Sequence, residues 1–427
     1  LKGVILVSDV DAVNENINIF QLAKQMLSPK TLPHLIVASM MSSLIFILVK
    51  ISEVFGAVAS VSLSLSYLLI AILANNNTIT NLTTLSEEHE SKTMLSRFFS
   101  SFKITVVPLL ISAVLFGVIL FSIGGKENNW IVPLLGFLFV IWSIAQSISF
   151  RVGMVEWFSN GLGDAKLHTY REKISTSSQI VIVQSFSFLI IWIGQILTEA
   201  ESMTFKDAFL GGFLFICLTL IAQIFTLWLT KDEREAAGSE KGLAAFSFKW
   251  MVIAQIFITW HLFTIYRRTF MDPTNTATVI EEAVLMALTV LFAVWSLTTY
   301  TVRDGKRLVS EKAALPLAIS FAYAYAGSVS VLSVAFDGID TVLIIGHFLS
   351  IITIIFLLKP TLRNSRISSD IISAPARAQK DETNVNSTSK PNDDEQPTTE
   401  EEWQEDNEID WDEGKNIAKD TDWKEDD

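Results

Sequence analysis

Apolar runs long enough to cross a lipid bilayer recur through most of this chain. Between Leu32 and Leu358 many runs extend for 17 to 22 residues without an Asp, Glu, Lys or Arg. A transmembrane helix needs about 20 such residues to cross a hydrocarbon core of roughly 30 Å. Only 18% of the 427 residues are charged, whereas soluble domains carry about a quarter. The repetition predicts a polytopic membrane protein.

We expect an all-α fold with about ten transmembrane helices. A β-barrel is the alternative for residues 60–67, "SVSLSLSY", because they alternate with period two. Barrel strands have only about 10 residues between turns, whereas this stretch lies inside a 21-residue apolar run, which favours a helix carrying serines. The predicted spans cover residues 32–49, 54–74, 104–124, 131–150, 179–198, 208–229, 250–266, 281–301, 314–335 and 339–358.

Basic residues in the connections alternate from one connection to the next. The N-terminal segment, the connections after even-numbered spans and the start of the tail hold 21 Lys and Arg, and the other side holds five. Because positive residues concentrate on the cytoplasmic side, we expect both termini in the cytoplasm and the protein in the cell membrane. Residues 91–103 and the stretch before the first span mix apolar and basic residues, which favours helices at the membrane interface.

The chain divides into three predicted parts: an amphipathic N-terminal segment, 1–31, a transmembrane domain, 32–358, and a cytoplasmic tail, 359–427. From residue 381 the tail holds 19 Asp and Glu against 4 Lys, so its net charge is −15, whereas the remaining chain carries +2. Such a segment buries too little apolar surface to fold alone, so we expect disorder. Its charge argues against binding nucleic acid.

Three isolated tryptophans interrupt the acidic tail: Trp403, Trp411 and Trp423. Tryptophan often anchors protein interfaces when it is buried. One interpretation is a set of short docking motifs for a cytoplasmic protein partner, and the other is a solvated tail that aids solubility.

Four glutamines fall on four successive predicted spans, each about four to six residues from the same end: Gln146, Gln184, Gln223 and Gln255. Amide side chains can join helices within lipid. The layer is therefore predicted either to bind helix to helix or to line a path for a neutral or zwitterionic solute. No span has an Asp, Glu, Lys or Arg at its centre, which argues against coupling through a buried carboxylate.

His347 is interpreted as the one histidine near mid-membrane. With the last hairpin turning near Asp337, it is expected opposite Gly327 and Ser328 and within about one turn of Tyr325. A buried hydrogen bond to tyrosine or serine, a ligand contact and a pH-sensitive group are the alternatives. A Ser–His hydrolase pair is disfavoured because no oxyanion donors are evident.

The external connection between the seventh and eighth spans has like-charged pairs at its two ends: Arg267 and Arg268, then Glu281 and Glu282. Helix dipoles favour cations in a last turn and anions in a first turn. A capping role explains both pairs, and an external vestibule for a charged ligand is the alternative.

Small residues recur every four positions in the ninth span, where Ala314, Ala318, Ala322, Ala326 and Ser330 form one stripe. A shorter stripe in the second span comprises Gly56, Ser60 and Ser64. Such stripes let helices approach closely.

No catalytic, cofactor or metal motif appears: the sequence has no H-E-x-x-H, no P-loop and only Cys217. The leading hypothesis is a transporter or permease-like protein for a small polar solute. The alternative is a non-transporting scaffold or signalling subunit that recruits a partner through its tail. The oligomeric state stays open.

Overall fold

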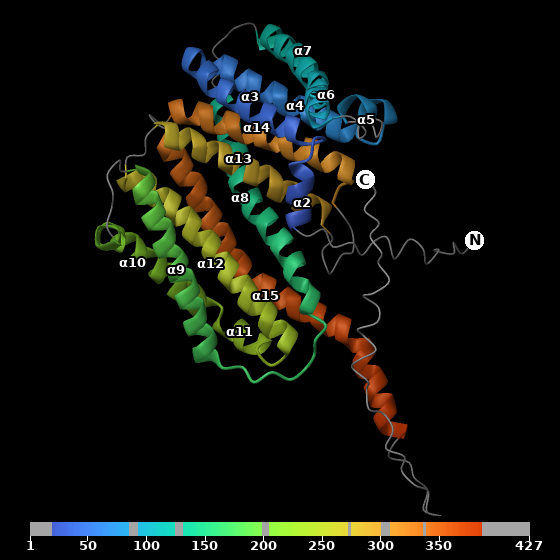
Figure 1. The fold of residues 1–427 in the computed structure, drawn as a ribbon, viewed down its shortest axis with the longest axis vertical. Coiled ribbons are helices and arrows are strands. Elements are labelled where there is room, and N and C mark those ends of the chain that lie inside the picture. The colour runs from blue at the N-terminus through green and yellow to red at the C-terminus, as the bar shows by residue number, and fades with distance from the viewer. Residues whose placement is uncertain are drawn as a thin grey trace, which may run out of the picture. The chain divides into compact units, whose positions relative to one another are not determined.

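The computed structural model describes residues 19–84, 93–123, 131–198, 205–271, 275–299, 308–335 and 339–386. Contacts divide the chain into two units, Leu1–Pro375 and Ala376–Asp427, and the long apolar helices pack within the first. Within the described residues every regular element is a helix (Figure 1).

Nine helices in this described part are long and apolar enough to cross a membrane. They are α3 (Leu32–Ile51), α4 (Glu53–Ile72), α7 (Val106–Ile123), α8 (Ile131–Phe158), α9 (Glu172–Thr198), α10 (Phe205–Leu229), α12 (Lys241–Phe270), α14 (Glu311–Ala335) and α15 (Ile339–Asn386). The remaining predicted span is α13 (Asn275–Thr298), which is apolar over Ala287–Thr298. The all-α polytopic fold is therefore confirmed.

The outward faces of these helices carry large apolar side chains. Phe121 on α7 is 89% exposed and Trp228 on α10 is 71% exposed, and Val114 and Ile221 are exposed beside them. Apolar surface of this extent is unfavourable in water and suits contact with lipid. The predicted interface segments form α2 (Ile19–Met26) and α6 (Met94–Lys103), with Leu95 and Phe99 exposed on α6.

The helix carrying the predicted serine alternation is α4, and it packs closely on α14. A Cβ added at Gly327 would overlap Ser60. Nearby, the Ser320 hydroxyl donates to the Ser64 carbonyl at 2.7 Å. The α14 stripe is buried along its length, and α4 is the most extensive described helix partner of α14 as a whole. The α4 stripe thus meets Ser320 and Gly327 of α14, which do not belong to the stripe found in the sequence of that helix.

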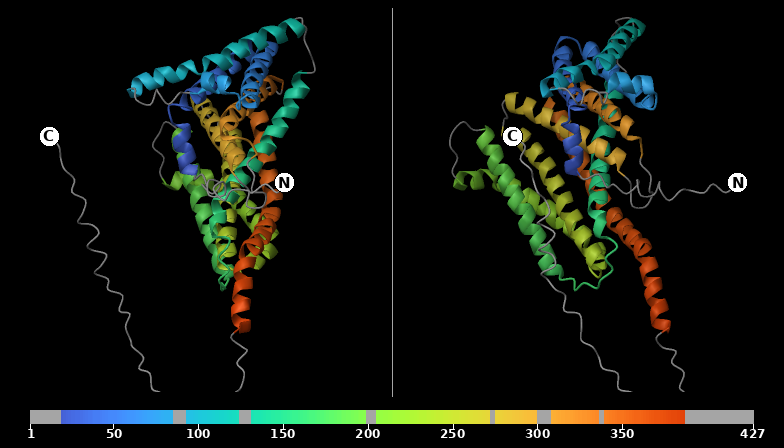
Figure 2. Two further views of the ribbon diagram at one scale, coloured as in Figure 1. Left: turned by 90° about the vertical axis from the view of Figure 1, so that its right-hand side faces the viewer. Right: turned by 45° about the vertical axis from the view of Figure 1, so that its right-hand side comes forward.

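The long helices form two groups with α8 and α13 between them. α3, α4, α7 and α14 pack together, and α9, α10 and α12 pack together. Figure 2 shows the second group (green to yellow) lying apart from α3, α4 and α7 (blue to cyan) in both views. α8 contacts α14 and α13 on one side and α12 on the other, so it joins the groups.

Three basic connections meet at one end of the second group. Around the isolated bridge between Leu167 and Glu240, the His168 amide donates to the Ser239 carbonyl at 2.9 Å. The Ser369 hydroxyl of α15 donates to the Leu162 carbonyl at 2.6 Å. These contacts join the connections before α9 and before α12 to the part of α15 that continues past the last predicted span. The sequence predicts the same side for all three.

Two short helices, α5 (Asn77–Thr83) and α11 (Lys231–Ala237), and the 3-10 turn η3 (Ser159–Gly161) complete the described elements. Glu233 of α11 accepts from Arg363 of α15 at 3.0 Å, and its side chain is only 8% exposed. The last helix continues beyond the predicted span end at Leu358 to Asn386. Its extension therefore supports the end of the bundle where the basic connections meet.

Candidate functional site

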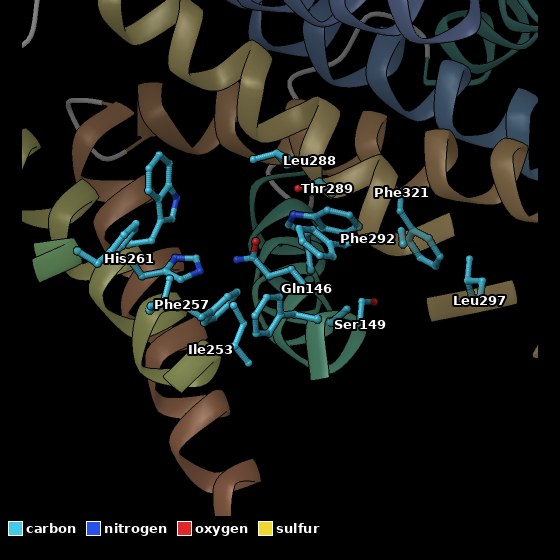
Figure 3. A pocket seen from close by; sticks show the side chains of 17 residues that line it. Gln146, Ser149, Ile253, Phe257, His261, Leu288, Thr289, Phe292, Leu297 and Phe321 are labelled. Atoms are coloured by element: carbon cyan, nitrogen blue, oxygen red, sulfur yellow. The ribbon is translucent and has the colours of Figure 1, made fainter. Parts of the chain in front are cut away.

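A cavity of about 280 Å³ lies where the two helix groups meet. Its walls come from α8, α9, α12, α13 and α14, so residues far apart in the sequence face one space (Figure 3). Ligand pockets in proteins typically occupy roughly 300–1,000 Å³, so the cavity suits a small molecule. The labelled lining residues are Gln146, Ser149, Ile253, Phe257, His261, Leu288, Thr289, Phe292, Leu297 and Phe321.

Aromatic rings form much of the wall. Phe150 of α8 packs on Phe257 of α12 with ring centroids 4.4 Å apart, and on Phe292 of α13 at 5.5 Å. The ring centroids of Trp142 on α8 and Phe321 on α14 lie 6.0 Å apart. Tilted and edge-to-face arrangements are the ones that pairs of aromatic rings prefer. These contacts join α8 to α12, α13 and α14 around the cavity.

Two buried histidines meet behind the cavity. The Nδ1 atoms of His261 on α12 and His347 on α15 lie 2.6 Å apart, and the side chains are 3% and 5% exposed. A nitrogen–nitrogen hydrogen bond requires one ring to donate and the other to accept. Only His261 lines the cavity, and the Nε2 atom of His347 is buried without a hydrogen-bond partner.

Gln146 of α8 reaches the same region from the opposite wall. Its Nε2 donates to the Ser350 hydroxyl of α15 at 2.5 Å. The Ser147 hydroxyl donates to the Ser350 carbonyl at 3.0 Å. These bonds hold α15 against α8 and fix the Gln146 amide at the edge of the cavity.

The other three predicted glutamines form a separate chain of hydrogen bonds. Gln184 of α9 donates to Gln223 of α10 at 3.0 Å, and Gln223 donates to Gln255 of α12 at 3.3 Å. Gln223 also donates to the Gln179 carbonyl, and Gln255 donates to the Thr226 hydroxyl. This geometry matches helix-to-helix bonding. Only Gln146 of the four predicted residues lines the cavity.

The expected hydrogen bond between His347 and Tyr325 does not form among the described residues. The Tyr325 ring stacks on Phe139 at 6.3 Å and lies 5.6 Å from Trp142, both on α8. His347 faces His261 instead, and a Cβ added at the neighbouring Gly346 would overlap Phe139. The prediction compared only the two helices of the hairpin, whereas α12 supplies the partner of His347 and α8 packs against α14 and bonds to α15.

Arg267 and Arg268 lie in the last turn of α12, where the helix dipole favours cations, and their side chains are buried. Glu281 and Glu282 belong to α13, but their side chains lie outside the described residues, so the vestibule hypothesis stays a prediction. The tail tryptophans Trp403, Trp411 and Trp423 also lie outside the described residues.

A second hollow of about 550 Å³ lies among α2, α3, α4, α5 and the start of α14. Within it His34 Nδ1 pairs with the Tyr67 hydroxyl at 3.1 Å, and its Nε2 lies 3.3 Å from the Thr83 carbonyl. Lys30 and Lys312 are among its lining residues. Because both nitrogens of His34 have partners within the helices, this histidine serves packing.

Sequence reasoning missed His261. It lies inside the predicted span 250–266, so His347 is not the only histidine in the bundle interior. A count of histidines within every predicted span would have found it, but only the fold shows that the two rings meet. No protein-family model, curated protein or solved structure matches this chain.

Proposed function

We propose that this protein is a transporter or permease-like carrier that binds a small solute in the cavity between α8, α9, α12, α13 and α14. The single observation that carries the proposal is the cavity itself, which brings Gln146 and His261 to one space inside a multi-pass bundle. Convergent polar groups in an apolar pocket are typical of ligand sites.

The packing supports a carrier because the cavity lies between two groups of helices that are each joined internally. The glutamine chain joins α9, α10 and α12, and small-residue packing joins α4 to α14. Carriers expose a central site to alternate sides largely by rocking one group of helices against another. The aromatic contacts between the groups contain no hydrogen bonds, so rocking one group against the other breaks none at these contacts.

For the setting we propose the cell membrane, with both termini in the cytoplasm, because the basic connections follow the positive-inside pattern. The three connections that meet before α9, before α12 and along α15 support a common side for those segments.

Counterflow in proteoliposomes tests the proposal. The probes are radiolabelled glucose, phenyl β-glucoside and leucine, which span polar, part-apolar and zwitterionic solutes. We expect saturable exchange of at least one of them, lost in Ala145→Trp, which fills the cavity, and kept in Ala113→Trp, which adds the same ring to an exposed alanine of α7.

Deletion of residues 387–427 separates the carrier from the scaffold hypothesis. A carrier keeps its exchange rate without the acidic tail. Absence of exchange for all three probes, together with tail-dependent capture of a protein that is lost when Trp403, Trp411 and Trp423 become alanine, would favour the scaffold.

A further inference from the structure

The lining of the cavity excludes charged ligands. Among its described lining residues there is no Asp, Glu, Lys or Arg, and the polar side chains other than indoles are Gln146, Ser149, His261 and Thr289. An isolated charge that leaves water for such surroundings is strongly disfavoured unless it is paired. A ligand that fills the aromatic part of this space is therefore uncharged.

Two polar groups face one another at one end of this apolar space. Figure 3 shows the Gln146 amide and the His261 imidazole directed toward each other from α8 and α12, with Phe257 and Phe292 beside them. A ligand that reaches this end meets both groups at once. The remainder of its surface meets rings and aliphatic side chains.

The hydrogen bonds already made determine what the two groups can offer. The Gln146 amide uses one N–H for Ser350, which leaves its Oε1 as an acceptor. His261 uses Nδ1 for His347, which leaves its Nε2. Neither remaining atom has a hydrogen bond among the described residues, and neither belongs to the fully buried polar atoms that lack a partner.

The histidine pair sets the role of that Nε2 atom. If His347 donates from Nδ1, its buried and unpartnered Nε2 carries no hydrogen. His261 then carries its own hydrogen on Nε2 and donates into the cavity. The opposite tautomers would bury an N–H of His347 without an acceptor, which is unfavourable. His347 is thus a positioning residue for His261.

We infer that the cavity binds an uncharged molecule with an apolar, ring-sized body and one hydroxyl or amide group, whose oxygen accepts from His261 and whose hydrogen is donated to Gln146. This rests on the solute site proposed above and narrows its ligand class from polar solutes to part-apolar ones.

Binding of three matched probes to the purified full-length protein in detergent tests the inference. Tritiated 1-naphthol, naphthalene and 1-naphthoate share one ring system and carry a hydroxyl, no polar group and a charge. Protein with the Ala145→Trp substitution, which fills the cavity, measures how much of each probe dissolves in the micelles alone. We expect 1-naphthol to bind tightest, with naphthalene weaker by about 2- to 10-fold per hydrogen bond lost and naphthoate weakest.

Substitutions test which residues cause the preference for 1-naphthol over naphthalene. His261→Phe and Gln146→Met should each lower the naphthol-to-naphthalene affinity ratio by about 2- to 10-fold while naphthalene binding persists. His347→Leu should also lower this ratio, which a purely structural role would not change. His34→Phe removes an equally buried histidine far from the cavity and should leave the ratio unchanged.

The outcomes separate the inference from the proposed function. Equal binding of naphthol and naphthalene, or preferred binding of naphthoate, overturns the ligand class even if counterflow is found. Selective naphthol binding without counterflow of any probe supports the ligand class and contradicts carriage.

Discussion

The Nδ1 atoms of His261 and His347 lie 2.6 Å apart and join α12 to α15 through two imidazoles that are both buried. The same α15 bonds to α8 through Ser350, so one helix supports both polar groups at the cavity end. The cavity wall formed by α8 and α12 therefore depends on a helix that contributes no described residue to the lining.

The histidine pair should be energetically coupled. His347→Leu leaves the Nδ1 atom of His261 without its partner, whereas His261→Leu/His347→Leu removes both polar groups. We expect the double variant to lose less stability than the sum of the single variants, by about 0.6–1.7 kcal/mol, as for hydrogen bonds within membranes. Reversible unfolding of the four proteins in mixed micelles measures this coupling, and additive losses would contradict it.

Gln223 should matter more to stability than Gln184. Gln223 is buried and bonds to residues of two other helices, α9 and α12, whereas Gln184 is half-buried and lies at the end of the chain of amides. We expect Gln223→Leu to reduce the free energy of unfolding by about 1–3 kcal/mol and Gln184→Leu by about half of that. The same micelle unfolding assay checks this. Equal losses of unfolding free energy in the two variants would show that Gln223 contributes no more to the chain of amides than Gln184 does.

The contact between α4 and α14 should tolerate no side chain at Gly327. Gly327→Val would overlap Ser60, and overpacking costs about 1–3 kcal/mol. The milder Gly327→Ala should be partly rescued by Ser60→Gly, as measured by the thermal midpoint in detergent. Gly117→Ala is the control because a Cβ there meets open space. A neutral Gly327→Val would mean that the two helices do not pack as described.

The connections before α9 and before α12 should cross-link. In a Cys217→Ser background, Leu167→Cys and Glu240→Cys place two thiols on residues that form an antiparallel bridge, a separation that a disulfide can span. We expect rapid oxidation to an intrachain disulfide that shifts gel mobility after proteolysis between the two sites. A membrane-impermeant maleimide should label both single-cysteine proteins from the same side. Labelling from opposite sides would overturn the proposed topology.

The sequence alone predicted the number and kind of the long helices well. Apolar length determines which segments can cross lipid, and each predicted span has a helix at its position within the described residues. The small-residue stripes of α4 and α14 were recognised, but the contact of the α4 stripe with Ser320 and Gly327 of α14 was not. A stripe shows that some helix comes close, and only tertiary packing determines which one.

The candidate site was harder to predict than the fold. Gln146 and Gln184 look equivalent in sequence, yet one lines the cavity and the other bonds to Gln223. The direction of each side chain depends on helix rotation, which an almost uniformly apolar helix does not encode. The hydrogen bond of His347 was expected to reach a tyrosine or a serine, but counting from the turn cannot reveal that α12 brings His261 to this position.

Accessibility of one cysteine in the cavity tests the central claim most directly. Ser149→Cys in the Cys217→Ser background lines the space, and Ser122→Cys on the exposed face of α7 is the lipid-facing control. A water-containing solute site predicts that N-ethylmaleimide labels Ser149→Cys, that 1-naphthol slows the labelling, and that the control reacts slowly with or without it. Failure of Ser149→Cys to react, or labelling that 1-naphthol leaves unchanged, would contradict a solute site between these helices.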